Sequence, residues 1–272
     1  MAISLHKPEE IFSRRHVPSW ILFAFSAGNV NALSILAFDN YVTHVTGTVT
    51  RFGLSLSHLD VLIDLIVIVV CFVLGAMFSA YLINGRVHQR KRPHYMLPLM
   101  IVGASMVFVA LAGHCDLLGE FGGTVDELGD FVMLSVLSFA MGLQNASVAT
   151  STGLLVRTTH LTGPATDLGV HLVELFYTTG DAQLLAKRHA ALRAGKIVAF
   201  AVGAIVAVPL ARRAQFLGFL LPAFTTFIAT AASFRAKHVE QPVVTEAELE
   251  RAARETALHR DTARPEAADH GP

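Results

Sequence analysis

Two segments of the chain share the pattern Thr-His-x-Thr-Gly, and each is typical of the start of a helix. They are residues 43–47 and 159–163. Pro164 follows the second one, and proline is favoured at the first helical position, so that Thr162 would cap this helix and Thr46 would cap its counterpart. The free N–H groups and partial positive charge of such helix starts suit an anion or a polar substrate group; simple capping at a surface is the alternative. The candidate site residues here are His44, Thr46, Gly47, Thr159, His160, Thr162 and Gly163.

The histidines of the two segments, His44 and His160, occupy equivalent places. If the segments re-entered the membrane, the two imidazoles could approach each other and bind a metal or relay protons. Capping or hydrogen bonding at the membrane interface is the commoner role of such a histidine. We therefore predict no metal site and no cofactor.

Amide side chains form the second group of candidate residues, and all of them lie in apolar stretches. They are Asn29, Asn31, Gln144 and Asn145. An amide without a partner in hydrocarbon costs about 4–8 kcal/mol, so these side chains must face protein or water. They either form hydrogen bonds between helices, worth only about 0.6–2 kcal/mol each, or line a polar site. Both interpretations remain open at this point.

The amides and the motifs lie in or beside long runs without a charged residue, and the helices formed by these runs must position them. Five of the six runs reach the roughly 20 residues that a helix needs to cross the hydrocarbon core. The shorter fifth run extends back through Lys196, whose side chain can reach the interface. We therefore predict an all-α integral membrane protein with six spans. The runs are residues 16–38, 65–85, 93–115, 131–156, 197–211 and 214–234.

The composition excludes several other classes of protein. Only 15% of the residues are charged, against about 25% in a soluble domain, which argues against a cytosolic enzyme. A net charge of zero argues against a nucleic-acid partner. Two isolated cysteines exclude a disulfide framework and a cysteine-rich zinc site. No catalytic set can be assembled, so we predict that the chain is not an enzyme.

An internal repeat links the two halves of the chain. Residues 43–54 and 159–170 are identical at six of twelve positions, with an offset of 116 residues. The same offset matches Asn29 with Asn145, each 17 residues before the second threonine of its motif. Two shorter matches follow in the same order, Phe72–Ala76 with Phe200–Ala204 and Leu97–Pro98 with Leu221–Pro222.

Each copy of the repeat holds three spans, and this odd number means that the second copy enters the membrane from the opposite side. The chain is therefore expected to be a 3+3 inverted repeat with breaks, resembling re-entrant segments, after the first and fourth spans. Sites in such proteins lie near the midplane, where the two halves meet. The expected parts are an N-terminus (1–15), the first repeat (16–113), an external loop (114–128), the second repeat (129–234) and a charged, partly disordered tail (235–272).

Lysine and arginine predict the orientation, because they mark cytoplasmic loops. They are frequent in the N-terminus, in the loops that follow the second and fourth runs, and in the tail, whereas residues 114–128 carry only acidic charges. Both termini are therefore expected in the cytoplasm. The pair Arg212–Arg213, in a very short turn, is the exception.

The motifs resemble those of the YoaK family of bacterial multi-spanning membrane proteins, a domain of unknown function. The family pattern has Gly-x-x-Asp-Ala in the first helix, then Thr-Gly-Asn, Gln-Asn-Ala and Thr-Thr-x-x-Thr-Gly, and the resemblance covers about residues 15–234. Asn31 stands here in place of the usual aspartate, and Thr48 in place of the asparagine. The resemblance implies six spans in the bacterial inner membrane and supplies no established activity.

These observations favour a transporter-like protein for a small molecule or ion, with a site between the two repeats. The alternative is a membrane scaffold or sensor that transports nothing, which the charged tail fits equally well. The expected partners are the lipid bilayer, a small polar or anionic substrate, and further copies of the chain in a homo-oligomer. A water-filled space near Asn29 and Asn145 would favour transport, whereas a dry, tightly packed interface would favour the alternative.

Overall fold

The structure is a computed structural model that describes residues 5–6, 8–54, 59–117, 119–122 and 128–234. Within these ranges it contains helices and loops and no strand, which confirms the all-α class. A π-helical turn, Tyr81–Gly85, continues α4 into α5, and a 3₁₀ turn, Gln215–Phe219, joins α9 to α10. The whole of the predicted tail (235–272) and part of the predicted external loop lie outside the described residues. The helices are α1 Pro8–Ile11, α2 Val17–Phe38, α3 Val45–Leu54, α4 Leu59–Ala80, α5 Arg86–His88, α6 Met96–His114, α7 Leu128–Ser151, α8 Thr162–Tyr177, α9 Gly180–Ala214 and α10 Leu220–Phe234.

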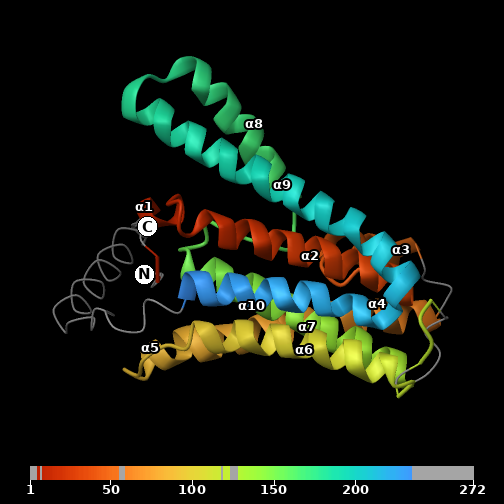
Figure 1. Cartoon of the computed structure of the whole chain (residues 1–272). Helices are drawn as coiled ribbons and strands as arrows, with labels where there is room; N and C mark the ends of the chain where they lie inside the picture. The colour runs from red at the N-terminus through yellow and green to blue at the C-terminus, as the bar shows by residue number, and fades with distance from the viewer. Residues whose placement is uncertain (1–4, 7, 55–58, 118, 123–127, 235–272) are drawn as a thin grey trace, which may run out of the picture. The chain divides into compact units, whose positions relative to one another are not determined.

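Five helical runs are long and apolar enough to cross a membrane, so the chain is a multi-span helical membrane protein. The first four coincide with the first four predicted spans. The fifth, Gly180–Phe234, contains both of the last two predicted spans. The chain turns at Gln215, where φ is 47°, and α10 then runs back along the bundle (Figure 1). Since α10 has only 15 residues, length and composition support five runs and do not establish the sixth span.

Two pairs of helices cross at very short distance. α2 packs along α9, and α7 packs along α4, while α10 contacts both α2 and α6, and α6 contacts α7. At each close crossing, a glycine of one helix lies directly on a backbone carbonyl of the other, where any Cβ atom would collide. Small residues allow this approach of two backbones. The four contacts are Gly28 with Phe200, Gly203 with Phe25, Gly142 with Phe72, and Gly75 with Phe139.

α8 and the first half of α9 form a helical hairpin that stands away from the other helices in Figure 1. The backbone is extended at Thr178 and Thr179 and has a positive φ of 64° at Gly180, which reverses the chain between the two helices. At 1.5 Å per residue, the 35 residues of α9 are roughly 50 Å long, well beyond the hydrocarbon thickness. The stretch 180–195, predicted as part of a loop, is therefore helical.

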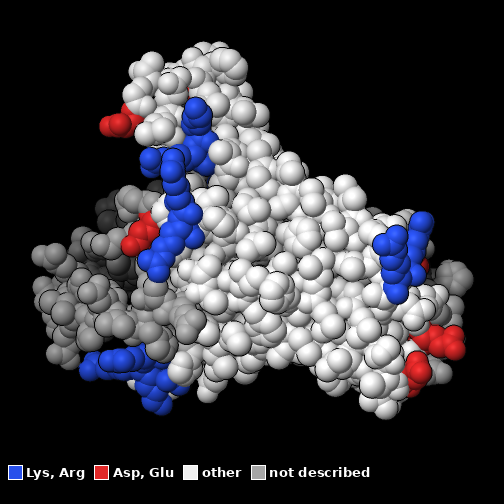
Figure 2. Space-filling view, in the orientation of Figure 1, with Lys and Arg blue, Asp and Glu red and all other residues white. Residues whose placement is uncertain are grey.

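The charged side chains gather at the two ends of the bundle. On the face shown in Figure 2, a broad band without Lys, Arg, Asp or Glu separates these ends. Basic residues, with some acidic ones, lie near α5 and on part of the α8–α9 hairpin at one end, and further basic and acidic residues lie at the other. This banding is the surface expected of helices that cross a bilayer.

Candidate functional site

Asn31 and Asn145 each hold the chain segment that follows their own helix. Oδ1 of Asn31 accepts a hydrogen bond from the backbone N–H of Thr43, with an N···O distance of 3.2 Å. Oδ1 of Asn145 accepts the corresponding bond from Thr158, also at 3.2 Å. Each bond ties the broken segment back to the helix it has just left. The two asparagines therefore make corresponding bonds, which pairs Asn31 with Asn145 and disagrees with the predicted match of Asn29 with Asn145.

The glycine contacts agree with this corrected match. Gly28 and Gly142 take the same place in their helix pairs and lie 114 residues apart, as do Asn31 and Asn145. The Thr-His-x-Thr-Gly motifs lie 116 residues apart, because Thr159 follows Asn145 by 14 residues whereas Thr43 follows Asn31 by 12. The offset taken from the motifs thus does not extend to the preceding helices.

Asn29 and Gln144 connect the two halves of the chain. Nδ2 of Asn29 donates to the carbonyl of Gly203 in α9 (2.9 Å), and Nε2 of Gln144 donates to the carbonyl of Phe23 in α2 (3.2 Å). Both side chains are fully buried. The amide oxygens, Oδ1 of Asn29 and Oε1 of Gln144, have no hydrogen-bond partner within the described part of the chain. Interhelical bonding thus accounts for the nitrogen atoms but not for the oxygens.

The predicted threonine caps are wrong, by two residues at Thr46 and by one at Thr162. α3 begins at Val45 and α8 at Thr162, so Thr46 and Thr162 lie inside their helices. The residue before α8 is Leu161, whose side chain makes no capping bond. The hydroxyl groups one turn later bond backwards instead, Thr50 to the carbonyl of Thr46 (3.0 Å) and Thr166 to that of Thr162 (3.1 Å). The hydroxyls of Thr43 and Thr159 are buried and have no hydrogen-bond partner among the described residues.

The glycine of the first motif makes room for the histidine three residues before it, whereas that of the second motif is at an ordinary contact distance from its histidine. A Cβ on Gly47 would collide with the His44 ring, and one on Gly163 would lie 3.4 Å from Cε1 of His160. The structure does not bring the two imidazoles together in any described contact: His44 stacks edge-on to Tyr41, while His160 lines a cavity beside α8. Within the described residues there is also no cluster of three or more metal-binding side chains.

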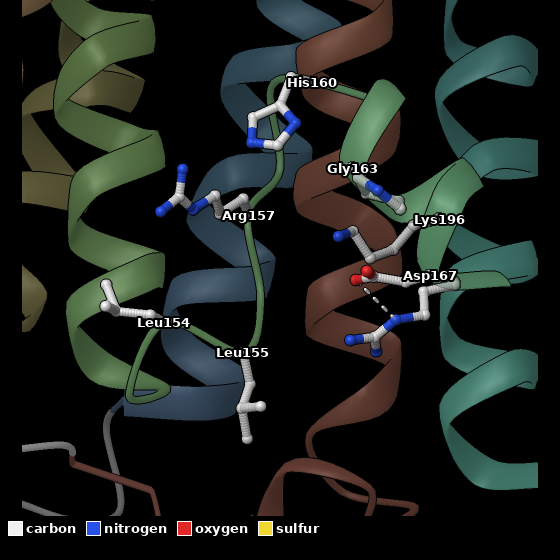
Figure 3. Close-up of a pocket in the computed structure, with 9 residues that line it drawn as sticks. Leu154, Leu155, Arg157, His160, Gly163, Asp167 and Lys196 are labelled. Carbon is white, nitrogen blue, oxygen red and sulfur yellow. Dashed lines mark hydrogen bonds and ion pairs between the residues drawn. The ribbon is translucent and has the colours of Figure 1, made fainter. Parts of the chain in front are cut away.

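A cavity of about 240 Å³ lies between the segment after α7, the start of α8 and the middle of α9 (Figure 3). Three basic side chains, one carboxylate and one imidazole line it, together with an apolar edge. The space between α3 and α4, of about 200 Å³, is lined almost entirely by apolar side chains. The charged cavity is lined by Leu154, Leu155, Arg157, His160, Gly163, Pro164, Asp167, Arg193 and Lys196.

Lys196 is the unusual member of this cavity. Its side chain reaches in from α9 toward Arg157 in Figure 3, and only 3% of the residue is exposed. Among the residues the structure describes, the ammonium has no hydrogen bond and no ion pair. The one carboxylate, that of Asp167, pairs with Nε of Arg193 at 3.2 Å. Burial, and then the positive charges of Arg157 and Lys196, lower the pKa of His160, so this imidazole is neutral at pH 7.

The comparison with protein families decides the identity of the chain. Residues 19–232 match the family described as "Protein of unknown function (DUF1275)". The chain belongs to this family. The resemblance to the YoaK family, which is DUF1275, is thereby confirmed. Neither the comparison with curated proteins nor that with solved structures finds a match.

The DUF1275 match includes both asparagine helices, both motifs and the whole charged cavity. Of the predicted site residues, His160 and Gly163 line the cavity. Arg157, Arg193 and Lys196 complete it, and none of them was among the candidates. Lys196 was expected to reach the membrane interface, and its position as a lone cation at the edge of an apolar run is the signal that could have marked it as a site residue. Its partners lie too far along the sequence for spacing to reveal them.

Proposed function

We propose that this DUF1275 protein is transporter-like and moves a small polar or anionic solute between two inverted halves of three spans each. The observation that carries the proposal is the reciprocal crossing of helices. The first helix of each half packs on a long helix of the other half: α2 on α9, and α7 on α4. Each crossing uses glycine against a phenylalanine carbonyl at matching positions. Such exchange between halves is typical of inverted repeats.

Further pairings support the same relation. Asn31 and Asn145 make equivalent bonds, α3 and α8 follow equivalent breaks, and α6 packs against α10. With α9 and α10 counted as two spans, each half contains an odd number of spans. The relation between the halves is then a half-turn about an axis in the membrane plane.

The contact between the halves also contains the polar atoms that a solute path needs. Oδ1 of Asn29 and Oε1 of Gln144 are buried carbonyl-type oxygens without a partner among the described residues. Such atoms are costly unless water or a solute group reaches them in some state of the protein. We place the path along this contact.

Replacing Gln144 by leucine should reduce transport by about tenfold or more, because the path loses a polar group that meets the solute. The test uses proteoliposomes and measures gradient-driven uptake of phosphate, sulfate, acetate and glycerol. At least one of these solutes should enter faster than into empty liposomes. The matched control is Gln89→Leu, the same change at an exposed position, which should keep wild-type uptake.

Two results would count against the proposal. One is uptake equal to that of empty liposomes for every solute. The other is a Gln144→Leu protein that folds, as judged by its melting temperature, and transports at the wild-type rate.

The basic residues support an orientation in the bacterial inner membrane with both termini in the cytoplasm. Exposed Cys115, at the end of α6, should then react from outside with a membrane-impermeant maleimide, in a Cys71→Ser background. A cysteine in place of exposed Lys91, in a chain that also lacks both native cysteines, should react only after permeabilisation. Labelling of both sites from one side would contradict the proposed topology.

The alternative is a membrane scaffold or sensor that transports nothing. Two observations favour it. The amide nitrogens of Asn29 and Gln144 bond to backbone carbonyls across the contact between the halves, as they would in a static interface. The helices are also closely packed there, and neither amide lines either of the two cavities described above, which is the packing expected of this alternative. On this alternative, Gln144→Leu lowers stability and no solute is taken up by the wild type. The uptake assay therefore separates the two functions.

A further inference from the structure

The charged cavity beside α8 has the properties of a binding site that the proposed transport does not require. We propose that it binds a phosphate group, with Lys196 as the central ligand. The inference concerns binding at equilibrium and holds whether or not the protein moves a solute. It rests on the burial of Lys196, on the charges around it and on the start of α8.

Lys196 supplies the first argument, because the residue is almost completely buried and its ammonium faces the cavity without a partner among the described side chains. Only 3% of the residue is exposed, and its side chain points into the cavity (Figure 3). Burying a charge is very costly unless it is paired and hydrogen-bonded. No described side chain pairs with this one, so an anion is the partner that the site lacks.

Asp167 does not fill that role. Its carboxylate is bonded to Arg193, and no ion pair joins it to Lys196. Counting three cations, Arg157, Arg193 and Lys196, against this one carboxylate leaves a formal charge of +2, with His160 neutral. A doubly charged anion would balance it.

The start of α8 adds hydrogen-bond donors to these charges. The first backbone bond into this helix runs from the N–H of Ala165 to the carbonyl of Leu161, and Pro164 has no N–H. The amides of Thr162 and Gly163 have no acceptor in the described part of the chain. Free amides and the positive end of a 16-residue helix together favour a phosphate group at this point.

The size and edge of the cavity restrict the ligand further. A volume of about 240 Å³ holds roughly eight water molecules at about 30 Å³ each, which is ample for a phosphate group. Leu154 and Leu155 form an apolar edge that can take an attached carbon chain. The phosphate can therefore belong to a free phosphate compound or to a lipid headgroup, and basic pockets between membrane helices do bind such headgroups.

The test compares Lys196→Met with Lys187→Met, a matched change at an exposed position of the same helix. The full chain is placed in phosphatidylcholine nanodiscs and titrated with inorganic phosphate by calorimetry. It is then placed in nanodiscs that contain phosphatidylglycerol, and the rise in melting temperature is measured. Since hydrogen bonds to charged groups are worth about 1.5–3 kcal/mol, Lys196→Met should weaken binding by roughly 10- to 100-fold. Lys187→Met should weaken it less than twofold.

Each outcome decides the proposal. Saturable phosphate binding that depends on Lys196 supports it with a free phosphate compound as ligand. Stabilisation by phosphatidylglycerol alone, again dependent on Lys196, supports it with a lipid headgroup. If Lys196→Met does not fold, Arg157→Gln, at an exposed side chain of the same cavity, is judged by the same criterion. Binding that neither variant weakens, or that Lys187→Met weakens as much, would overturn it, as would the absence of binding in the wild type.

Discussion

Replacing Gly142 by alanine is expected to lower the melting temperature of the protein far more than the same change at Gly169. The added Cβ would collide with the backbone carbonyl of Phe72, and a backbone atom cannot move aside as the end of a side chain can. α7 and α4 must therefore separate, at a cost of about 1–3 kcal/mol. A Cβ on Gly169 meets nothing within 4 Å, and alanine is the better helix former.

The same experiment tests the relation between the halves. Gly28→Ala meets the carbonyl of Phe200 in the other helix pair, in the same geometry, and should lower the melting temperature by a similar amount. Thermal unfolding of the three variants in one detergent provides the comparison. If Gly142→Ala and Gly169→Ala shifted the transition equally, the close crossing would not limit stability. If Gly28→Ala were harmless, the two helix pairs would not be equivalent.

The spans could be predicted from the sequence because they follow from one physical requirement. A helix in hydrocarbon tolerates few charges over roughly 20 residues, so the absence of charge marks its length directly. The run 131–156 illustrates the limit of this signal, since α7 ends at Ser151 although no charge occurs before Arg157. Charge shows where the membrane can end, whereas the end of a helix depends on local backbone bonds.

α9 shows the opposite error: here the helix is longer than the uncharged run that predicted it, again because charge does not mark the end of a helix. Lys187, Arg188 and Arg193 suggested a loop before the fifth span, yet the helix runs through all three. Lysine, arginine and alanine are good helix formers, and no proline occurs between Gly180 and Pro209. A charged stretch beside a span can therefore be a helical extension, and here it forms one wall of the charged cavity.

The cavity itself could not be predicted from spacing. Arg157 and Lys196 are 39 residues apart in sequence, and only the return of α9 along α8 brings them to one space. The sequence did identify His160 and Gly163, because the motif is repeated. Its threonines were assigned as caps, but a hydroxyl inside a helix can equally bond to the carbonyl four residues before it, as Thr166 does.

Replacing Asn145 by leucine is expected to release the segment after α7, whereas Asn145→Asp should hold it. The buried N–H of Thr158 donates to Oδ1 of Asn145, and loss of that acceptor costs about 1–3 kcal/mol. The local opening free energy should fall by this amount, so amide hydrogen exchange in residues 152–161 should become roughly 5- to 150-fold faster. Aspartate keeps an acceptor oxygen at the same position and should leave the exchange rate close to that of the wild type.

The corresponding changes at Asn31 test why the family can use aspartate there. In this chain only Oδ1 of Asn31 is used, as the acceptor for the N–H of Thr43, and a carboxylate can supply the same oxygen. Asn31→Asp should therefore preserve slow exchange at Thr43, and Asn31→Leu should lose it by the factor expected for Asn145→Leu. Unchanged exchange in both leucine variants would show that the breaks are held by packing instead. Fast exchange in Asn31→Asp would show that the amide nitrogen matters, and the asparagine would then have a role in this chain that the aspartate of its relatives cannot perform.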